Sequence, residues 1–370
     1  MRLGINGWRL CGSRTGVSRY LLNVIRHWTP DVASRFTRIT LYTPRPIDRR
    51  EMPLPPNIDE QVLASDWPML VWENARLAPA SRDDILFCPS YSRPLFTRSR
   101  TVVATHDTVY HVRPELFPWS VRAGYRQLYD WSDRHATLII TDGEAVKEDI
   151  VRFCRVPASK IRVTYLAPAA CFSPIGDRAE LNGVRDRHVG NVPFFLYVGK
   201  MSGRRSLPHL LEAFAVFKRR APSPHRLLLV GLNPQNLDLQ RMSRALGIAD
   251  DVRRSGYVDD ADLNRLYNAA EAFVMPSVYE TSSLPVMEAQ AAGLPVICIQ
   301  TPGMHEITGG AALQIPTLDA SLLADAMLQL STDTALRAQL ATDGLRNAAR
   351  FSWQRCSTET LAVLEEAADL

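Results

Sequence analysis

Apolar, strand-like runs alternate with helix-like segments along most of this chain, and the alternation stops only once. Alternating strands and helices indicate parallel sheets covered by helices on both faces, because a parallel crossover needs a connection of about a dozen residues or more. The interruption spans 173–192, where Gly, Asn, Asp and Arg replace apolar residues, which is typical of an interdomain linker. With 370 residues, the chain is long enough for two domains. We therefore expect an α/β protein with Rossmann-like parallel-sheet domains over 1–172 and 193–350.

The periodicity of apolar residues assigns the individual elements. We expect strands at 1–10, 38–43, 84–89, 100–107 and 136–142, and again at 194–200, 225–232, 252–258, 272–277 and 295–300. We expect helices at 16–28, 119–136, 207–220, 235–246, 260–270 and 284–292. Two sheets of this type, facing each other across a central cleft, predict a nucleotide site beyond the carboxyl ends of their strands.

Composition excludes several classes of protein. No apolar run approaches the roughly 20 residues that span a bilayer, and the N-terminus lacks the apolar core of a signal peptide, so we expect a cytoplasmic protein. The six cysteines, at positions 11, 88, 154, 171, 298 and 356, are scattered and form no CxxC pair. This spacing argues against a zinc site or a disulfide framework, and we expect most of them to be small buried side chains.

Charge is distributed unevenly, although the net charge is only +4. Residues 1–170 hold 24 Lys and Arg against 17 Asp and Glu, whereas residues 171–370 hold 19 against 22. Two interpretations fit the basic first half: a solvated surface, or a face for an anionic membrane or a phosphorylated acceptor. The arginines are scattered and no basic run is interleaved with aromatic residues, so nucleic acid is not an expected partner.

Two carboxylates frame the stretch YETSSLPVMEAQAA (279–292), which follows an apolar strand-like run. Glu280 precedes the expected helix, Glu288 lies about one turn inside it, and Ser282 and Ser283 are candidate N-cap residues. The free N–H groups at such a helix end form an anion site, and the flanking carboxylates suit the hydroxyls of a sugar nucleotide. Alternatively, Glu288 only complements the helix dipole and Glu280 is a surface loop residue.

A second strand–turn–helix unit, LYVGKMSGRRSLPHLLEAF (196–214), carries basic residues on its turn. Fixed cations at the mouth of a sheet hold phosphate groups, and they stabilise a leaving nucleoside diphosphate where its negative charge develops. We expect Lys200 and Arg205 to bind phosphate. For Arg204, a solvated surface position is the simpler interpretation.

These residues resemble a known family. The C-terminal half resembles the retaining GT-B glycosyltransferases of family 4, the "glycosyl transferases group 1" class. The turn VGKMSGRRSLPHLLEAF (198–214) is similar to that family's VGxxxxRKNLxxLLEAF segment, and GYVDDADLNRLYNAAEAFVMPSVYE (256–280) resembles the run that follows it. Glu280 and Glu288 form the family's Glu-x7-Glu motif, and AAGLPVICIQTPGMHEI (291–307), which contains Glu306, is similar to its next segment.

The N-terminal half resembles the same family, especially its mannosyltransferase-like subgroup. RTGVSRYLLNVI (14–25) looks like the N-terminal glycine loop and first helix, and VVATHDTVYHVRPELFP (102–118) looks like the His-Asp signature. TDGEAVKEDIVRFCRVPASKIRVTYLAPAACFSP (141–174) parallels the segment before the linker. FSWQRCSTETL (351–361) resembles the element that opens the last helix, so this likeness implies that 351–370 joins the N-terminal domain.

The resemblance implies roles for matching positions. Glu280 would hold hydroxyls of the donor sugar, Lys200 and Arg205 would grip the diphosphate, and His106 would lie where donor sugar and acceptor meet. Glu288 would hold the ribose. The other implied donor-binding residues are Gly16 in the glycine loop, Ser282, Ser283 and Leu284 beside the diphosphate, and Tyr257 and Val258 near the base.

The resemblance also implies an activity. It implies a retaining, metal-independent hexosyltransferase without a cofactor, whose donor is a nucleoside-diphosphate sugar: GDP-mannose is favoured and a UDP-sugar is the alternative. The acceptor would be a glycan or lipid-linked saccharide in bacterial surface polysaccharide synthesis. The basic first half of the chain, rather than the resemblance, suggests peripheral attachment to the inner face of the plasma membrane. Two departures put the donor in question: Thr281, Ser282 and Ser283 replace the family's Gly-Phe-Gly, and Ala167 and Ala169 replace a glycine and an aspartate before the linker.

Rival interpretations remain. A GT-B sugar-nucleotide epimerase or a non-catalytic nucleotide-sugar-binding protein would use the same kind of site. A NAD enzyme is disfavoured because no G-x-G-x-x-G follows the first strand. Asp260 and Asp262 spell the DxD of metal-dependent glycosyltransferases, but capping and the helix dipole explain carboxylates that open a helix, so no metal site is expected.

Overall fold

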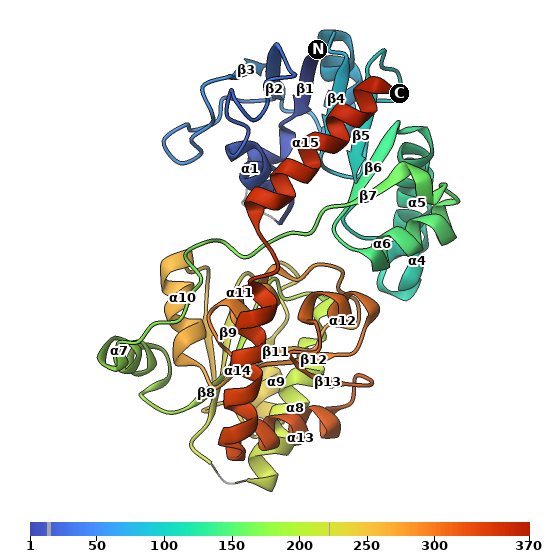
Figure 1. Ribbon diagram of the computed structural model, residues 1–370. Helices are drawn as coiled ribbons and strands as arrows, with labels where there is room; N and C mark the ends of the chain where they lie inside the picture. Colours follow the sequence, from blue (N-terminus) through green and yellow to red (C-terminus); the bar gives the residue numbers. More distant parts are fainter. Residues whose placement is uncertain (13–15, 222) are drawn as a thin grey trace. The chain divides into compact units, whose positions relative to one another are not determined.

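The computed structural model describes residues 1–12, 16–221 and 223–370, and it divides into two compact units (Figure 1). Unit 1 comprises Met1–Leu166 together with Ser352–Leu370, and unit 2 comprises Ala167–Phe351. Each unit holds one all-parallel sheet with helices around it. The expected pair of Rossmann-like domains is therefore confirmed. In the described part of the chain, no helix is both long enough and apolar enough to cross a membrane.

The sheet of unit 1 has seven strands in the order β3-β2-β1-β4-β5-β6-β7. Most of these strands are apolar and buried on both faces. A parallel sheet that helices cover on both faces has such continuous apolar runs in its sequence. The strands are β1 (Arg2–Asn6), β2 (Arg38–Thr43), β3 (Ile58–Val62), β4 (Ile85–Cys88), β5 (Arg100–Ala104), β6 (Leu138–Thr141) and β7 (Ile161–Val163). The helices are α1 (Gly16–Arg26), α2 (Met69–Trp72), α3 (Ala78–Ala80), α4 (Val109–Val112), α5 (Trp119–His135), α6 (Glu144–Asp149) and α15 (Trp353–Asp369); between them lie the shorter helical turns η1 (Trp8–Leu10), η2 (Glu73–Leu77), η3 (Pro114–Leu116), η4 (Ile150–Cys154) and η5 (Ala158–Lys160).

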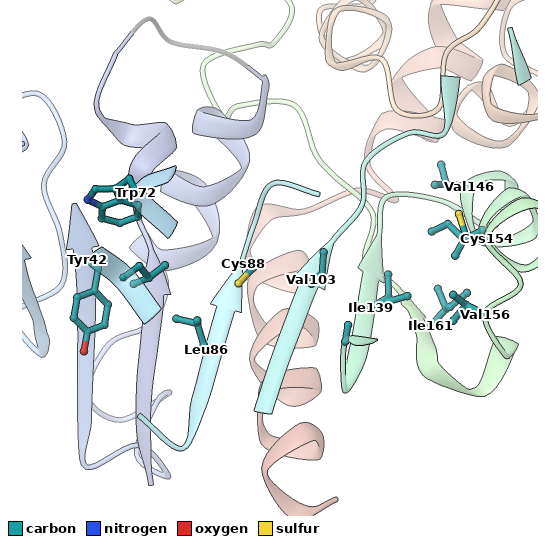
Figure 2. Close-up of a cluster of buried hydrophobic side chains, with 13 residues drawn as sticks. Tyr42, Trp72, Leu86, Cys88, Val103, Ile139, Val146, Cys154, Val156 and Ile161 are labelled. Atoms are coloured by element: carbon teal, nitrogen blue, oxygen red, sulfur yellow. The ribbon is translucent and has the colours of Figure 1, made fainter. Parts of the chain in front are cut away.

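One face of this sheet is covered by a continuous apolar cluster. Figure 2 shows it running from Tyr42 on β2 to Ile161 on β7, with Trp72 reaching in from α2 and Val146 from α6. Cys154 closes the cluster at the end of η4. Since Trp72 and Cys154 are fully buried, this core fixes the helices that follow β3 and β6 against the sheet.

The last helix belongs to unit 1. Helix α15 packs beside α1 and against strands β4 to β6 (Figure 1). Ser352 caps it, since its side chain accepts a hydrogen bond from the Arg355 N–H. The buried Ser357 hydroxyl donates to the Val24 carbonyl of α1 over 2.6 Å, so the docked face makes polar as well as apolar contacts.

The sheet of unit 2 has six strands in the order β10-β9-β8-β11-β12-β13. They are β8 (Phe194–Val198), β9 (Arg226–Val230), β10 (Val252–Ser255), β11 (Ala272–Met275), β12 (Val296–Ile299) and β13 (Leu313–Ile315). The helices are α7 (Arg178–Val189), α8 (Leu207–Arg220), α9 (Leu239–Ala245), α10 (Asp260–Ala269), α11 (Leu284–Ala291), α12 (Pro302–Thr308), α13 (Ala320–Thr332) and α14 (Thr334–Ala348), and the turn η6 (Gly203–Arg205) precedes α8.

The segment 173–192 is not a linker. It contains α7, which lies beside α10 inside unit 2 (Figure 1). Asp177 caps α7 by accepting from two backbone N–H groups, and Gly190 ends it in the left-handed region. An Arg265–Glu180 ion pair of 2.6 Å fastens it to α10. The linker prediction was wrong because α7 buries only two valines, so polar contacts rather than an apolar stripe hold it in place.

Candidate active site

Strands β8 and β11 lie side by side in the sheet of unit 2, although β9 and β10 separate them in sequence. From β8, the strands β9 and β10 follow towards one edge of the sheet. The chain then crosses to the other side of β8, where β11, β12 and β13 follow towards the opposite edge. Such a reversal opens a crevice at the carboxyl ends of the two central strands, which is where ligands bind in open α/β sheets. The candidate residues that follow β8 and β11 all lie at this point.

Arg205 is fixed at this reversal point. Its Nε lies 3.0 Å from Oε1 of Glu280, and its Nη1 lies 3.1 Å from the sulfur of Met275 at the end of β11. Arg204 is also near, with its Nε 3.9 Å from the same Glu280 oxygen. The side chains of Arg205 and Glu280 are only 12% and 5% exposed. The turn after β8 therefore aims two guanidinium groups at one buried carboxylate.

Glu280 keeps unused capacity to accept hydrogen bonds. Among the described residues, its Oε1 accepts no hydrogen bond of good geometry, even though Arg205 lies at ion-pair distance. A buried carboxylate is expensive unless its lone pairs are satisfied. An oxygen in this state is suited to accept from hydroxyl groups of a ligand.

Helix α11 begins beside Glu280 and presents unused donors. Its intrahelical bonds start when the Val286 and Met287 N–H groups donate to the Ser283 carbonyl, so the Ser283 and Leu284 N–H groups precede them. Ser283 holds the N-cap position as expected, but its hydroxyl makes no capping bond. That hydroxyl is buried and has no hydrogen-bond partner in the described chain. An unpaired buried hydroxyl costs about 1–3 kcal/mol, which a ligand at this helix end would offset.

Glu288 lies in the second turn of α11 and is buried. Its Oε2 accepts a hydrogen bond of 3.1 Å from the buried Tyr267 hydroxyl of α10. Sequence analysis did not single out this tyrosine, because it reaches Glu288 from another helix. Glu288 is therefore a positioned carboxylate, and its role towards a ribose stays a prediction.

The other predicted donor-binding residues are placed as follows. Lys200 is exposed on the turn after β8. Tyr257 is 65% exposed and Val258 is partly exposed between β10 and α10. Gly16 is the exposed first residue of α1 in unit 1, and Arg14 and Thr15 of the predicted glycine loop lie outside the described residues. Ser282 is half-buried beside Ser283.

His106 follows β5 in unit 1 and is only 8% exposed. Its Nδ1 lies 2.9 and 3.0 Å from the two oxygens of Asp142, and its Nε2 lies 2.9 Å from the Pro89 carbonyl oxygen. Burial by itself would lower the pKa of His106, but the Asp142 carboxylate and the Pro89 carbonyl together raise it. An ionised Asp142 and the Pro89 carbonyl are both acceptors, so this geometry favours a proton on each ring nitrogen, in agreement with the raised pKa of His106. Sequence reasoning missed Asp142.

The DxD pair lies at the start of α10. Asp259, rather than Asp260 or Asp262, caps α10 by accepting from the Asp262 N–H over 2.8 Å. The Asp262 carboxylate pairs with Arg265 one turn later. The expected helix-opening role is thus correct for the segment, although the capping residue is its neighbour.

Comparison with known proteins agrees with this arrangement. The model of the "Glycosyl transferases group 1" family matches residues 184–346. The chain is 30% identical over 282 residues to the O-antigen chain mannosyltransferase B of Escherichia coli, which covers 76% of this chain and 74% of that protein. The chain belongs to the glycosyl transferases group 1 family.

Two solved structures share the fold of this chain. Sucrose-phosphate synthase from Thermosynechococcus elongatus superimposes with a TM-score of 0.77 at 18% identity, covering 99% of this chain and 98% of that one. Anabaena HepE in complex with UDP-glucose superimposes with a TM-score of 0.75 at 17% identity, covering both chains completely. The GT-B fold class is therefore shown, and the chain is a group 1 glycosyltransferase.

Gly303 at the start of α12 supports the Glu280 loop. A Cβ at this position would lie 2.3 Å from the Glu280 carbonyl oxygen and 2.9 Å from Thr281 Cα, so the backbone would have to move. We expect Gly303→Ala to lower the free energy of unfolding by about 1–3 kcal/mol and to weaken nucleotide binding. Urea unfolding and calorimetric titration measure the two effects. Gly183→Ala in α7 is the control, since its Cβ meets nothing within 4 Å; equal losses in both variants would contradict the expectation.

Proposed function

We propose that this glycosyltransferase transfers a hexose, with retention of configuration, from a nucleoside-diphosphate sugar to a hydroxyl of a glycan or lipid-linked saccharide. The observation that carries the proposal is the convergence of Arg205, Glu280 and the start of α11 at the reversal point of the unit 2 sheet. Cations and free N–H groups suit a diphosphate, and a buried carboxylate suits sugar hydroxyls.

The diphosphate would lie between the guanidinium groups of Arg204 and Arg205 and the N–H groups of Ser283 and Leu284. As the bond to the sugar breaks, negative charge builds on the leaving phosphate. Donors that are already in place stabilise that charge without reorganisation. The unpaired hydroxyl of Ser283 takes the place of a glycine in the family's usual turn and would donate directly to phosphate.

Glu280 would hold donor-sugar hydroxyls with the oxygen that Arg205 leaves unsatisfied. Glu288 would accept from the ribose with the carboxylate that Tyr267 orients. No side chain is assigned as a covalent nucleophile. In the retaining reaction implied by the family resemblance, the acceptor attacks the same face that the diphosphate leaves, and the leaving phosphate takes the acceptor's proton.

His106 would act as a fixed cation and hydrogen-bond donor rather than as a base, because Asp142 and the Pro89 carbonyl favour a proton on both ring nitrogens. The resemblance puts this residue where donor sugar and acceptor meet. Asp142 would set its charge and orientation. This role is distinct from general-base catalysis, for which a neutral ring is needed.

GDP-mannose is the favoured donor. The relative named as an O-antigen chain mannosyltransferase supports it. A UDP-sugar is the second candidate, and the fold neighbour in complex with UDP-glucose favours it.

We also propose that the reaction needs no metal ion and takes place at the inner face of the membrane, where the basic first half of the chain meets anionic lipid. Co-sedimentation with anionic vesicles at low and high salt tests this attachment. If the protein shows no salt-sensitive binding to the vesicles, the proposed membrane attachment is wrong.

A thermal-shift screen with GDP, UDP, ADP and their sugar conjugates tests the proposal. A ligand that binds only the folded state stabilises it by about 2.7 kcal/mol at a concentration 100-fold above its Kd. We expect GDP and GDP-mannose to raise the melting temperature most, and Glu288→Gln to remove most of that shift. A larger shift with UDP would reassign the donor.

Two rival functions give different results in the same preparation. A sugar-nucleotide epimerase would turn over its donor without an acceptor, and a non-catalytic binding protein would be stabilised but would transfer nothing. Stabilisation by no nucleotide at all would count against the site at β8 and β11. The Thr281–Ser283 departure would then mark a lost function.

A further inference from the structure

Unit 1 contains a mixed cluster of metal-ligating side chains away from His106. His111 on α4, Asp130 on α5 and Cys154 at the end of η4 each offer one ligand atom, and these atoms all lie within 4.8 Å of one another. Among the described residues, this is the group whose spacing suits a metal ion. The side chains of His111 and Asp130 are each 5% exposed, and Cys154 is fully buried.

One oxygen of Asp130 is crowded. Its Oδ1 lies 2.9 Å from His111 Nε2, 3.0 Å from the Tyr110 hydroxyl and 3.5 Å from Cys154 Sγ. A carboxylate oxygen has two lone pairs, so three donors on one oxygen exceed what it can accept well. Two of these three groups, the imidazole and the thiol, become ligands when they lose a proton.

Asp133, three residues further along α5, adds a second buried carboxylate. It is 0% exposed; its Oδ1 accepts from Thr105 over 2.7 Å, and its Oδ2 has no hydrogen-bond partner in the described chain. The Cys154 thiol also faces this carboxylate. The Arg134 guanidinium is 3.8 Å from Asp130 and half-exposed. Lys160, which is partly exposed, interacts with Asp133. Two buried carboxylates therefore lie on α5 with only partly exposed cations beside them.

We propose that His111, Asp130 and Cys154 bind Zn²⁺. Zinc takes mixed nitrogen, sulfur and oxygen ligands in a tetrahedron, and three protein ligands leave the fourth position to a water molecule. On binding, the thiol proton of Cys154 passes to solvent. The imidazole of His111 presents an unprotonated Nε2 and keeps one proton on Nδ1, and the metal charge offsets the thiolate and the Asp130 carboxylate. The ion joins α4, α5 and η4.

The present geometry is close to such a site. Zn–S of about 2.3 Å and Zn–O of about 2.0 Å at a tetrahedral angle place sulfur and oxygen about 3.5 Å apart, which is the separation of Cys154 Sγ and Asp130 Oδ1. The His111–Asp130 distance of 2.9 Å is shorter than the roughly 3.3 Å of two ligands, so the imidazole must withdraw slightly. Outer contacts are in place: Phe153 stacks on His111 at 5.1 Å, and Tyr110 orients Asp130.

Cobalt binding tests this proposal without reference to transferase activity. Untagged, full-length protein is stripped with a chelator and titrated with Co²⁺, which reports a thiolate ligand as near-ultraviolet charge-transfer absorption and tetrahedral geometry as intense visible bands. We expect stoichiometric binding, displacement of Co²⁺ by Zn²⁺, and zinc in the protein as purified from zinc-supplemented medium. Cys154→Ser should lose the charge-transfer band, whereas Cys171→Ser, at an exposed cysteine of unit 2, should keep it.

The result that overturns the proposal needs no variant. If wild-type protein that is folded by circular dichroism shows no charge-transfer band in excess Co²⁺, the cluster is a hydrogen-bond network and not a metal site. A band that persists in Cys154→Ser also overturns it. If Cys154→Ser does not fold, His111→Gln replaces it, with loss of the tetrahedral visible bands as the expected result.

Discussion

Arg205→Ala is expected to lower kcat/KM for sugar transfer by about 10²–10³-fold, because a preorganised charge at the leaving group is removed. Arg205→Lys should lower kcat/KM less, because lysine keeps the positive charge but lacks the planar guanidinium that donates two parallel hydrogen bonds. Arg219→Ala, on the exposed end of α8, is the matched control and should transfer sugar at the wild-type rate. A radiolabelled-donor assay gives kcat and KM for each variant.

Stability must be separated from catalysis in this variant. Removing Arg205 leaves the buried Glu280 with only the more distant Arg204 as an ion-pair partner, which costs up to about 3–5 kcal/mol. The double variant Arg205→Ala/Glu280→Ala removes both charges, so we expect it to recover much of the lost melting temperature. It should remain inactive, because the diphosphate and the sugar hydroxyls have both lost their partners. A double variant that regains activity along with stability would show that the pair is only structural.

The sequence predicts the central strands well and the sheet edges poorly. Strands such as β4, β8 and β11 are covered on both faces, so they appear as apolar runs that propensity alone detects. The edge strand β3 reads IDEQV and is mostly exposed, so nothing distinguishes it from a loop. Sequence analysis assigns no helix or strand to residues 301–350, although they fold into α12, β13, α13 and α14. Of these, β13 is only three residues long.

The candidate site was predictable where its residues are close in sequence. The turn after β8 and the start of α11 each carry their chemistry within a few positions, and parallel topology brings the two turns together at Arg205 and Glu280. The partners Tyr267 and Asp142 were missed because they arrive from other elements. Most of the cysteines are buried, as expected: Cys88, Cys154, Cys298 and Cys356. The contact between Cys154 and Asp130 was not predicted, because the two residues come from different elements.

Asp142→Asn is expected to move the pH dependence of transfer. In the wild type, the Asp142 carboxylate raises the pKa of His106 although burial opposes the charge. The imidazolium therefore persists above the ordinary pKa of histidine, and it is lost only as pH rises through the raised value. Asparagine removes the anionic partner but leaves the ring buried, so the pKa of His106 should fall, although the Pro89 carbonyl and Asp107 still raise it.

The sign of the effect follows from these two shifts. If the cationic ring is the active form, kcat/KM falls on the alkaline side of the profile, and in Asp142→Asn this fall should begin at lower pH. Activity of the variant should approach that of the wild type at acid pH, where both rings are protonated. An NMR titration of the His106 ring protons measures the pKa directly, and Asp84→Asn, at a half-exposed carboxylate of the same unit, should leave it unchanged. If Asp142 were purely structural, Asp142→Asn would lower activity equally at every pH. If His106 were a base, kcat/KM would fall on the acid side of the pH profile. The side on which kcat/KM falls therefore shows whether His106 acts through its charge or by proton transfer.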